Sequence, residues 1–251
     1  MVLIRCAMAA LVATLVMAPC VARAATNMDQ LVYSFTYSSN QNVTTRDSNT
    51  NVEGANATGL SGEQSNGMSH YGGSLHDKGT ITVDIVKQQP DGALVITISE
   101  QGQDVRRAPP AECVVYGNTH VICDPSKTVY TEEYTLMRFL GRNFVDPNQL
   151  DANKHWVITQ NSGGLDVSAN YTIGSNNDGK MQISETRSLR QPGGGSLTTD
   201  IQTKIGYDFP QSLPTSVDEY VTQRHDDGVA GNTTTIYQTT LNLLSDTMAK
   251  T

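Results

Sequence analysis

The chain has 251 residues, of which 17% are charged, and a formal net charge of −8 at pH 7. An acidic protein with no basic cluster is a poor candidate for binding nucleic acid or an anionic membrane surface. The chain is long enough to bury a sizeable core, and its abundance of Asn, Thr, Ser, Gly and Gln favours a β protein with neutral, polar outer faces.

The N-terminus has the pattern of a secretory signal peptide. Arg5 supplies a positive charge, residues 6–18 form an apolar run, and residues 22–24 read Ala-Arg-Ala, a cleavage site of the A-x-A type. The apolar run is shorter than the roughly 20 residues that a membrane-spanning helix requires. A retained N-terminal anchor and a lipid anchor on Cys20 are the alternatives. We therefore expect residues 1–24 to be cleaved and the protein to be exported, to the periplasm or the extracellular space.

The mature chain is expected to carry one disulfide. Removing 24 of the 251 residues leaves 227, and the loss of two arginines changes the formal charge from −8 to −10. No break in composition divides residues 25–251, so we expect a single β-rich domain with no transmembrane segment. Its two cysteines, Cys113 and Cys123, predict a disulfide in an oxidising compartment. The sequence has no second pair of ligands at the spacing of a zinc site.

The spacing of these cysteines predicts the loop between them. Two short apolar runs flank Gly117-Asn118, which is typical of a β-hairpin. A two-residue loop leaves the cysteines one position out of register. A three-residue loop, 117–119, places Cys113 opposite Cys123, within disulfide reach. We expect the three-residue loop, with Gly117 or Asn118 at the positive φ. A redox-active pair is the alternative, but the C-x-x-C spacing is absent.

Period-two alternation marks the strands of the first half. Residues 31–38 place Leu, Tyr, Phe and Tyr on one face. Residues 79–87 and 93–101 form a hairpin around the turn at 89–92, which reads Gln-Pro-Asp-Gly. Residues at about 48–73 are polar, rich in Asn, Gly and Ser, and show no periodicity. We interpret them as a mobile loop, with a binding loop as the alternative.

One helix is expected, near residues 131–140. Thr131 is a candidate N-cap, two glutamates follow in the first turn, and a glycine lies just past the end. Tyr134, Met137 and Leu140 share a broad apolar face. Such a face must be buried, and it is expected to cover an end or an open side of a sheet.

Six further strands are expected after the helix. Their connections contain Gly, Asn, Pro and Asp, and short connections of this kind join antiparallel neighbours. The six ranges are 155–160, 165–173, 180–189, 196–207, 217–224 and 233–243. The predicted fold class is mainly β: a single antiparallel meander of about eleven strands, curled into an incomplete barrel or folded as a sandwich, with the one inserted helix.

The order of signal peptide, long antiparallel meander and mid-chain helix resembles the periplasmic lipoprotein-carrier family. The chain also resembles exported bacterial β-rich proteins. The likeness to the carriers is one of topology and covers most of the mature chain. The carriers begin with a helix and have an arginine inside the cavity, whereas this chain begins with a strand and that arginine has no assigned counterpart. The resemblance implies a hydrophobic cavity that holds lipid or acyl chains.

Motifs of the common catalytic sites are absent from the sequence. It contains no G-x-S-x-G in a strand–turn–helix context, no P-loop, no G-x-G-x-x-G and no H-E-x-x-H. His76-Asp77 and His225-Asp226-Asp227 are the best candidates for metal or acid–base chemistry, but solvated residues near strand ends show the same pattern. We expect no cofactor, no metal site and no catalytic residue.

The leading hypothesis is a non-enzymatic exported protein that binds a hydrophobic ligand, a lipid or an acyl chain, between the curved sheet and the helix. The candidate ligand-binding residues come from the apolar faces: Tyr33, Phe35, Tyr37, Tyr134, Met137, Leu140 and Trp156. A structural or envelope-associated interaction protein without a ligand is the first alternative. A hydrolase is the second, and it requires one of the His–Asp pairs to meet a serine or tyrosine in a cleft.

Overall fold

The computed structural model describes residues 29–46, 61–65, 68–103, 107–116, 119–141, 144–145, 154–162, 165–191, 196–226 and 231–247. The predicted signal peptide lies outside this part of the chain. The elements of the described part are β1 (Asp29–Arg46), β2 (Ser61–Ser65), β3 (Met68–Gln88), β4 (Leu94–Gly102), β5 (Arg107–Val115), β6 (Val121–Cys123), α1 (Thr131–Met137), β7 (His155–Ser162), β8 (Leu165–Asn177), β9 (Lys180–Gln191), β10 (Ser196–Asp208), β11 (Leu213–Asp226) and β12 (Gly231–Asp246).

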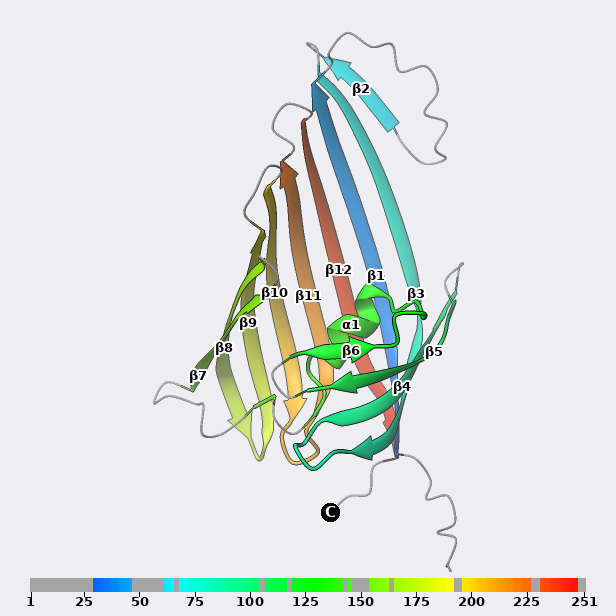
Figure 1. Cartoon of the computed structure of the whole chain (residues 1–251), viewed down its shortest axis with the longest axis vertical. Coiled ribbons are helices and arrows are strands. Elements are labelled where there is room, and N and C mark those ends of the chain that lie inside the picture. Colours follow the sequence, from blue (N-terminus) through cyan, green and yellow to red (C-terminus); the bar gives the residue numbers. More distant parts are fainter. Residues whose placement is uncertain are drawn as a thin grey trace, which may run out of the picture.

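The strands form one open antiparallel sheet. Their order is β6-β5-β4-β3-β1-β12-β11-β10-β9-β8-β7, and β2 pairs with β3 outside this path. The sheet curls until β4, β5 and β6 lie opposite β11 and β12, with α1 between them (Figure 1). Within the described residues, α1 packs against β4, β11 and β12. The predicted fold class, a mainly β antiparallel sheet that curls without closing around one helix, is confirmed.

The chain runs through the sheet in two meanders that meet in its middle. The first and last strands, β1 and β12, are neighbours and pair from Leu31 with Asp246 to Thr45 with Gly231. The two edges are β6 and β7, which are consecutive in the sequence. The connection between these edges contains α1. The helix therefore belongs to the segment that has to cross the open side of the curled sheet.

The disulfide hairpin has the predicted register. Cys113 of β5 faces Cys123 of β6, their Cα atoms are 4.0 Å apart, and they form a disulfide. The backbone amide of Tyr116 donates a hydrogen bond to the carbonyl of His120 at 2.9 Å. The loop between them therefore has three residues, as the cysteine spacing predicted.

Positive φ angles mark two of the turns. In the disulfide hairpin the described residue with this conformation is Thr119, at 64°. The sequence predicted Gly117 or Asn118 there, and both lie outside the described residues. In the turn between β8 and β9, Asp178 and Gly179 have φ of 51° and 83°. This is the two-residue hairpin turn that an Asp-Gly pair favours.

Part of the predicted mobile loop at 48–73 is strand instead. Ser61–Ser65 form β2, and residues 68–73 are the start of β3, which pairs with β1 without a register shift. The interpretation as loop was wrong for these residues. Backbone hydrogen bonds to a neighbouring strand require no apolar alternation, so polar composition alone does not exclude a strand. Residues 48–60 lie outside the described part.

The helix is shorter than the predicted range of 131–140. It ends at Met137, and a turn leads on to Gly141, whose φ of 102° fits the glycine stop expected there. Its N-cap is Tyr130 rather than Thr131. The carboxylate of Glu133 accepts a hydrogen bond from the Tyr130 backbone amide at 2.8 Å, and so satisfies one of the free donors at the helix start.

The packed core lies between the helix segment and the concave face of the sheet. Phe144 is at the centre of an aromatic cluster. Its ring centroid lies 5.2–5.9 Å from those of Phe139, Trp156, Tyr171 and Tyr207, in edge-to-face contacts. These contacts attach the segment after α1 to β7, β8 and β10, and they fix the position of the helix over the sheet.

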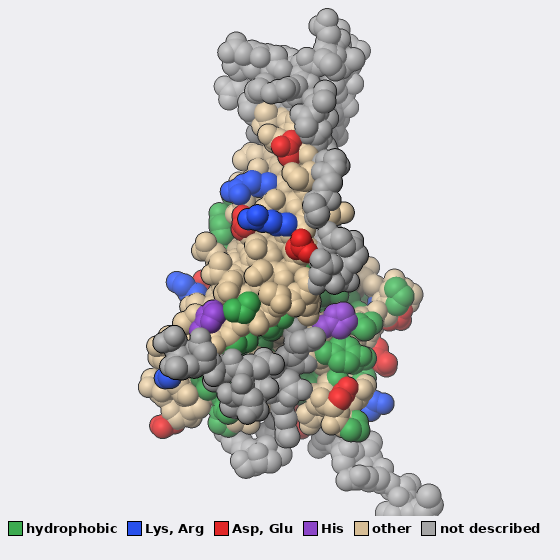
Figure 2. Space-filling model, turned by 60° about the vertical axis from the view of Figure 1, so that its left-hand side comes forward, with side chains coloured by type: hydrophobic (Ala, Val, Ile, Leu, Met, Phe, Trp, Pro, Cys, Tyr) green, Lys and Arg blue, Asp and Glu red, His purple; other side chains and the backbone are tan. Residues whose placement is uncertain are grey.

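The outer faces of the long strands are mainly neutral and polar. Figure 2 shows one such face, on which few charged side chains interrupt the backbone and neutral polar groups, while hydrophobic side chains gather towards the lower part. This agrees with a composition that is low in charge.

Candidate functional site

A row of buried polar residues crosses the concave face of the sheet. The antiparallel register places the seven residues side by side on β8, β9, β10, β11, β12, β1 and β3, and none is more than 6% exposed. We call them the polar belt, and they are Tyr171, Glu185, Thr203, Glu219, Thr239, Tyr37 and Asp77. Side chains alternate between the faces of a strand, so the next inward-facing rows lie two residues away on each side.

The polar belt separates the packed core from a cavity. On the core side the next inward row is apolar, with Ile173, Ile183, Ile205, Val217, Leu241 and Phe35 on the same strands. On the other side the row contains Ala169, Arg187, Ile201, Val221 and Tyr237. The first row belongs to the core, whereas four members of the second row line the cavity.

Arg138, at the C-cap of α1, attaches the helix to the polar belt. Its guanidinium forms ion pairs with Glu219 and, at 3.3 Å, with Glu185. The hydroxyl of Thr135, one turn earlier, donates to the other oxygen of Glu219 at 2.7 Å. All of these groups are buried. A buried arginine with two carboxylates is stable only when the geometry satisfies each charge, and here each carboxylate has the cation and further donors.

Two hydroxyls of the belt complete the partners of Glu185. Tyr171 donates to one carboxylate oxygen at 2.8 Å and Thr203 to the other at 2.7 Å. Burial alone disfavours the charge of Arg138, but Glu185 and Glu219 outweigh it and raise the pKa of Arg138 above its ordinary value. Arg138 is therefore cationic at any physiological pH, and its contacts assign it to holding the helix.

The cavity beside the belt lies between the helix and the sheet, is partly open to solvent and has a volume of about 540 Å³. On the helix side it is lined by Thr131, Tyr134, Thr135 and Arg138. On the sheet side its wall includes Arg187, Leu189, Ile201, Val221, Gln223 and Tyr237. The cavity is within the roughly 300–1,000 Å³ range of small-molecule sites, and its wall combines apolar side chains with polar and charged ones.

Arg187 is the charged residue of the cavity that has few partners. Its side chain is 11% exposed, and its Nη1 lies 3.9 Å from the Glu185 carboxylate. Its Nε and Nη1 are buried and have no hydrogen-bond partner within the described part of the chain. Burial lowers the pKa of Arg187, and the like charge of Arg138 lowers it further. The guanidinium therefore lies in an environment that an additional anion would improve.

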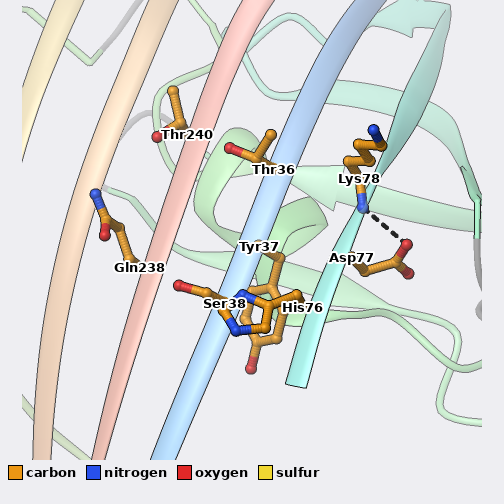
Figure 3. Close-up of a pocket in the computed structure, with 8 residues that line it drawn as sticks. All are labelled: Thr36, Tyr37, Ser38, His76, Asp77, Lys78, Gln238 and Thr240. Atoms are coloured by element: carbon orange, nitrogen blue, oxygen red, sulfur yellow. Dashed lines mark hydrogen bonds between the residues drawn. The ribbon is translucent and has the colours of Figure 1, made fainter. Parts of the chain in front are cut away.

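A second cavity of about 380 Å³ lies on β1, β3 and β12 (Figure 3). Its lining includes His76 and Asp77, which the sequence offered as a candidate pair for metal or acid–base chemistry. Ser38 and His76 are register partners there. Asp77 is buried and accepts a hydrogen bond from the backbone amide of Lys78 at 2.7 Å, whereas His76 is exposed. Neighbours in a strand face opposite sides, so Asp77 is not placed to orient the His76 imidazole.

His225 and Asp226 are likewise consecutive residues of β11, and Asp227 lies outside the described residues. Within the described ranges, no group of three or more His, Cys, Asp or Glu side chains is arranged to hold a metal ion. The same part of the chain has no helix with the length and hydropathy of a membrane span.

The predicted ligand-binding residues fall into two groups. Tyr134 lines the cavity beside α1, and Tyr37 lines the second one. The other five are at most 3% exposed and belong to the packed core: Tyr33, Phe35, Met137, Leu140 and Trp156. The apolar faces read from the sequence thus form mainly the packed core, whereas the sheet wall of the cavity comes from the inward row on the other side of the belt.

The charged residues of the site were missed in the sequence. The signal for two of them was present: Glu185 and Arg187 continue the inward alternation of Met181 and Ile183 in β9. A charged residue at a predicted inward position indicates either a buried network or a binding group. Glu219, between Val217 and Val221 in β11, has the same signature.

Comparisons with known proteins found no relative. No family model matches the chain, and neither a curated protein nor a solved structure matches it. The comparisons therefore support neither the resemblance to lipoprotein carriers nor a bacterial origin.

Proposed function

We propose that this protein is an exported, non-enzymatic protein that binds a hydrophobic ligand, a lipid or an acyl chain, between α1 and the curved sheet. The observation that carries the proposal is the cavity of about 540 Å³ beside the polar belt, with its apolar side chains Leu189, Ile201, Val221 and Tyr237. Export is supported by the signal-peptide pattern of residues 1–24 and is compatible with the Cys113–Cys123 disulfide.

The position of the cavity favours a ligand over a merely loose core. The belt residues Glu185, Thr203 and Glu219, which are hydrogen-bonded to one another's partners, lie between the cavity row and the apolar core row of the same strands. Its apolar wall residues Ile201 and Tyr237 are only partly buried, although the strands that carry them bury their next inward residues fully. Burying this apolar surface under an alkyl chain contributes about 25 cal/mol per Å².

An interaction protein without a ligand remains the second candidate function. The packed core below the belt favours it, because five of the seven candidate residues are used for packing and none of those five lines either cavity. The two candidates differ in what filling the cavity does. When a large side chain fills the cavity, a ligand-binding protein should lose affinity for its ligand. An interaction protein that binds no ligand should keep its properties.

The test fills the cavity from the sheet side. Ile201→Trp places a large side chain in the row beside the belt, and we expect it to weaken binding of the neutral probe 1-hexadecanol roughly tenfold or more. The reason is that the indole excludes at least two methylene groups, each worth about 0.8 kcal/mol of burial. Affinity is measured by displacement of the uncharged dye Nile red.

The matched control is Gln202→Trp, one residue along β10, where the side chain faces outwards and is exposed. This variant adds the same indole but leaves the cavity open, so it should bind 1-hexadecanol like the unmodified protein. Absence of 1-hexadecanol binding to the unmodified protein would reject the proposal. Equal binding by both tryptophan variants would place the ligand elsewhere.

A further inference from the structure

Resting on the proposed function, we infer that the ligand is an amphiphile with an anionic head, of the fatty-acid type. Its carboxylate binds the guanidinium of Arg187, and its alkyl chain lies across the sheet along Ile201 and Val221. The inference goes beyond the proposed function because it names the head group, the residue that recognises it and the direction of the chain.

Arg187 has the donors that such a head requires. Among the described residues, its Nε and Nη1 are buried without a hydrogen-bond partner, and its guanidinium has an ion-pair contact of 3.9 Å with one carboxylate oxygen of Glu185. Leaving buried donors unpaired is costly, and the cost is removed when an acceptor arrives with a ligand. The planar fork of an arginine matches the two oxygens of a carboxylate.

The neighbouring carboxylates, Glu185 and Glu219, do not serve as acceptors for the unpaired donors of Arg187. Glu185 accepts from Tyr171 and Thr203 and pairs with Arg138. Glu219 is held by Arg138 and by Thr135. Both carboxylates are therefore bound by the other arginine, and a carboxylate head in the cavity would give Arg187 an acceptor of its own.

The strand register places a row of apolar side chains where the alkyl chain of the ligand would lie. Ile201 of β10 lies opposite Arg187, Val221 of β11 lies opposite Ile201, and Tyr237 of β12 lies opposite Val221. These four side chains form one inward row that begins with the cation and continues with apolar groups. Tyr134 of α1 lines the same cavity from the other side. An amphiphile with its head at β9 therefore lays its chain across the strands between sheet and helix.

Arg187 should discriminate between amphiphiles by the charge of their head groups. A neutral head leaves the donors of Arg187 without a charged acceptor, and a cationic head meets two arginines. Because Nε and Nη1 are buried, binding of the head requires a rotation of the guanidinium towards the cavity, which Arg187 already lines. A carboxylate is expected to bind about 10- to 100-fold more tightly than a hydroxyl on the same chain, the usual gain for a charge-assisted hydrogen bond.

The test compares hexadecanoic acid with 1-hexadecanol, using displacement of Nile red from the full mature protein. The unmodified protein should prefer the acid. Arg187→Gln should abolish this preference, so that the variant binds the acid no more tightly than the alcohol. The matched control is Arg190→Gln, which removes the same charge from an exposed, outward-facing position three residues along β9. It should retain the preference for the acid.

The outcomes separate this inference from the proposed function. If neither ligand binds, the proposed function fails. If both bind equally to the unmodified protein, or if Arg187→Gln keeps the preference, the inference is overturned while the hydrophobic site stands. Should Arg187→Gln lose near-ultraviolet circular dichroism, Arg187→Lys replaces it: the lysine keeps the charge without the fork, and an intermediate preference supports the inference, whereas an unchanged preference contradicts the role of the fork.

Discussion

At the scale of single residues, the two arginines near the polar belt have different environments. Arg138 is paired with two carboxylates that in turn accept bonds from belt hydroxyls, so removing it leaves two buried negative charges. Arg187 shares one carboxylate at longer distance. The first arrangement is that of a structural anchor, and for the second we propose a role in binding.

Arg138→Ala should therefore destabilise the protein by about 3–5 kcal/mol, the usual result of breaking a buried ion pair on one side. Adding Glu219→Gln to this variant should recover part of the loss, because it removes one of the unpaired charges. The free energy of unfolding is measured by urea denaturation. Arg224→Ala is the control: its pair with Asp200 is exposed and is worth about 0–1 kcal/mol. Equal losses in the two alanine variants would contradict the anchor.

Three buried tyrosines should make the free energy of unfolding decrease at alkaline pH. Burial raises the pKa of Tyr33, Tyr171 and Tyr207 above the ordinary value of 10.0. A raised folded-state pKa means that the stabilisation is complete below pH 10 and is lost as the pH rises towards the folded-state values. Stability should fall by about 1.4 kcal/mol per pH unit for each of these tyrosines above pH 10.

The check is urea denaturation at a series of pH values, together with tyrosinate absorbance. The fully buried Tyr33 hydroxyl donates to the Pro214 carbonyl at 2.8 Å, so Tyr33→Phe removes one of the three groups and should make the pH dependence shallower. A flat stability profile above pH 10, or ionisation of all tyrosines without unfolding, would show that these side chains are not protected.

At the scale of the elements, the helix segment acts as a fixed part of the core. Leu140 is 2% exposed, belongs to the core cluster and does not line the cavity. Phe139 and Phe144 continue the same packing into the aromatic cluster. The end of the helix is thus held from the core side, while Tyr134, which is 43% exposed, lines the cavity.

Leu140→Ala should cost about 2–5 kcal/mol of unfolding free energy, because it leaves a hole in a packed core. Affinity for 1-hexadecanol should change little. The control Leu244→Ala truncates a leucine that is 60% exposed on β12 and should cost less than about 0.5 kcal/mol. A small loss of stability for Leu140→Ala, combined with altered ligand retention, would instead identify the helix as a movable lid.

Some of the strands could be predicted from sequence patterns alone, and others could not. Strands with one apolar face, such as the one that contains Tyr33 and Phe35, and the Cys113–Cys123 hairpin could be predicted because burial and disulfide geometry impose a register. The start of β5 could not, since Pro109 and Pro110 argue against a strand. They are tolerated because, within the described part of the chain, β6 pairs with residues 113–115 and leaves the start of β5 as an edge.

At the scale of the whole molecule, the strand order explains why the polar belt could not be predicted from the sequence. The meander was predictable from short turns, but the pairing of β1 with β12 and the opening between β6 and β7 depend on contacts between distant parts of the chain. The polar belt exists only in that arrangement: its residues come from seven strands, and no local pattern brings Glu185 and Glu219 to the same arginine.

The most direct test of the central claim is native mass spectrometry of the mature chain, prepared in an oxidising compartment and mixed with equimolar 1-hexadecanol. The account predicts one ligand per chain for the unmodified protein and for Gln202→Trp, and a clearly lower occupancy for Ile201→Trp. An unmodified protein without bound ligand, or equal occupancy in Ile201→Trp, would contradict a hydrophobic site between α1 and the sheet.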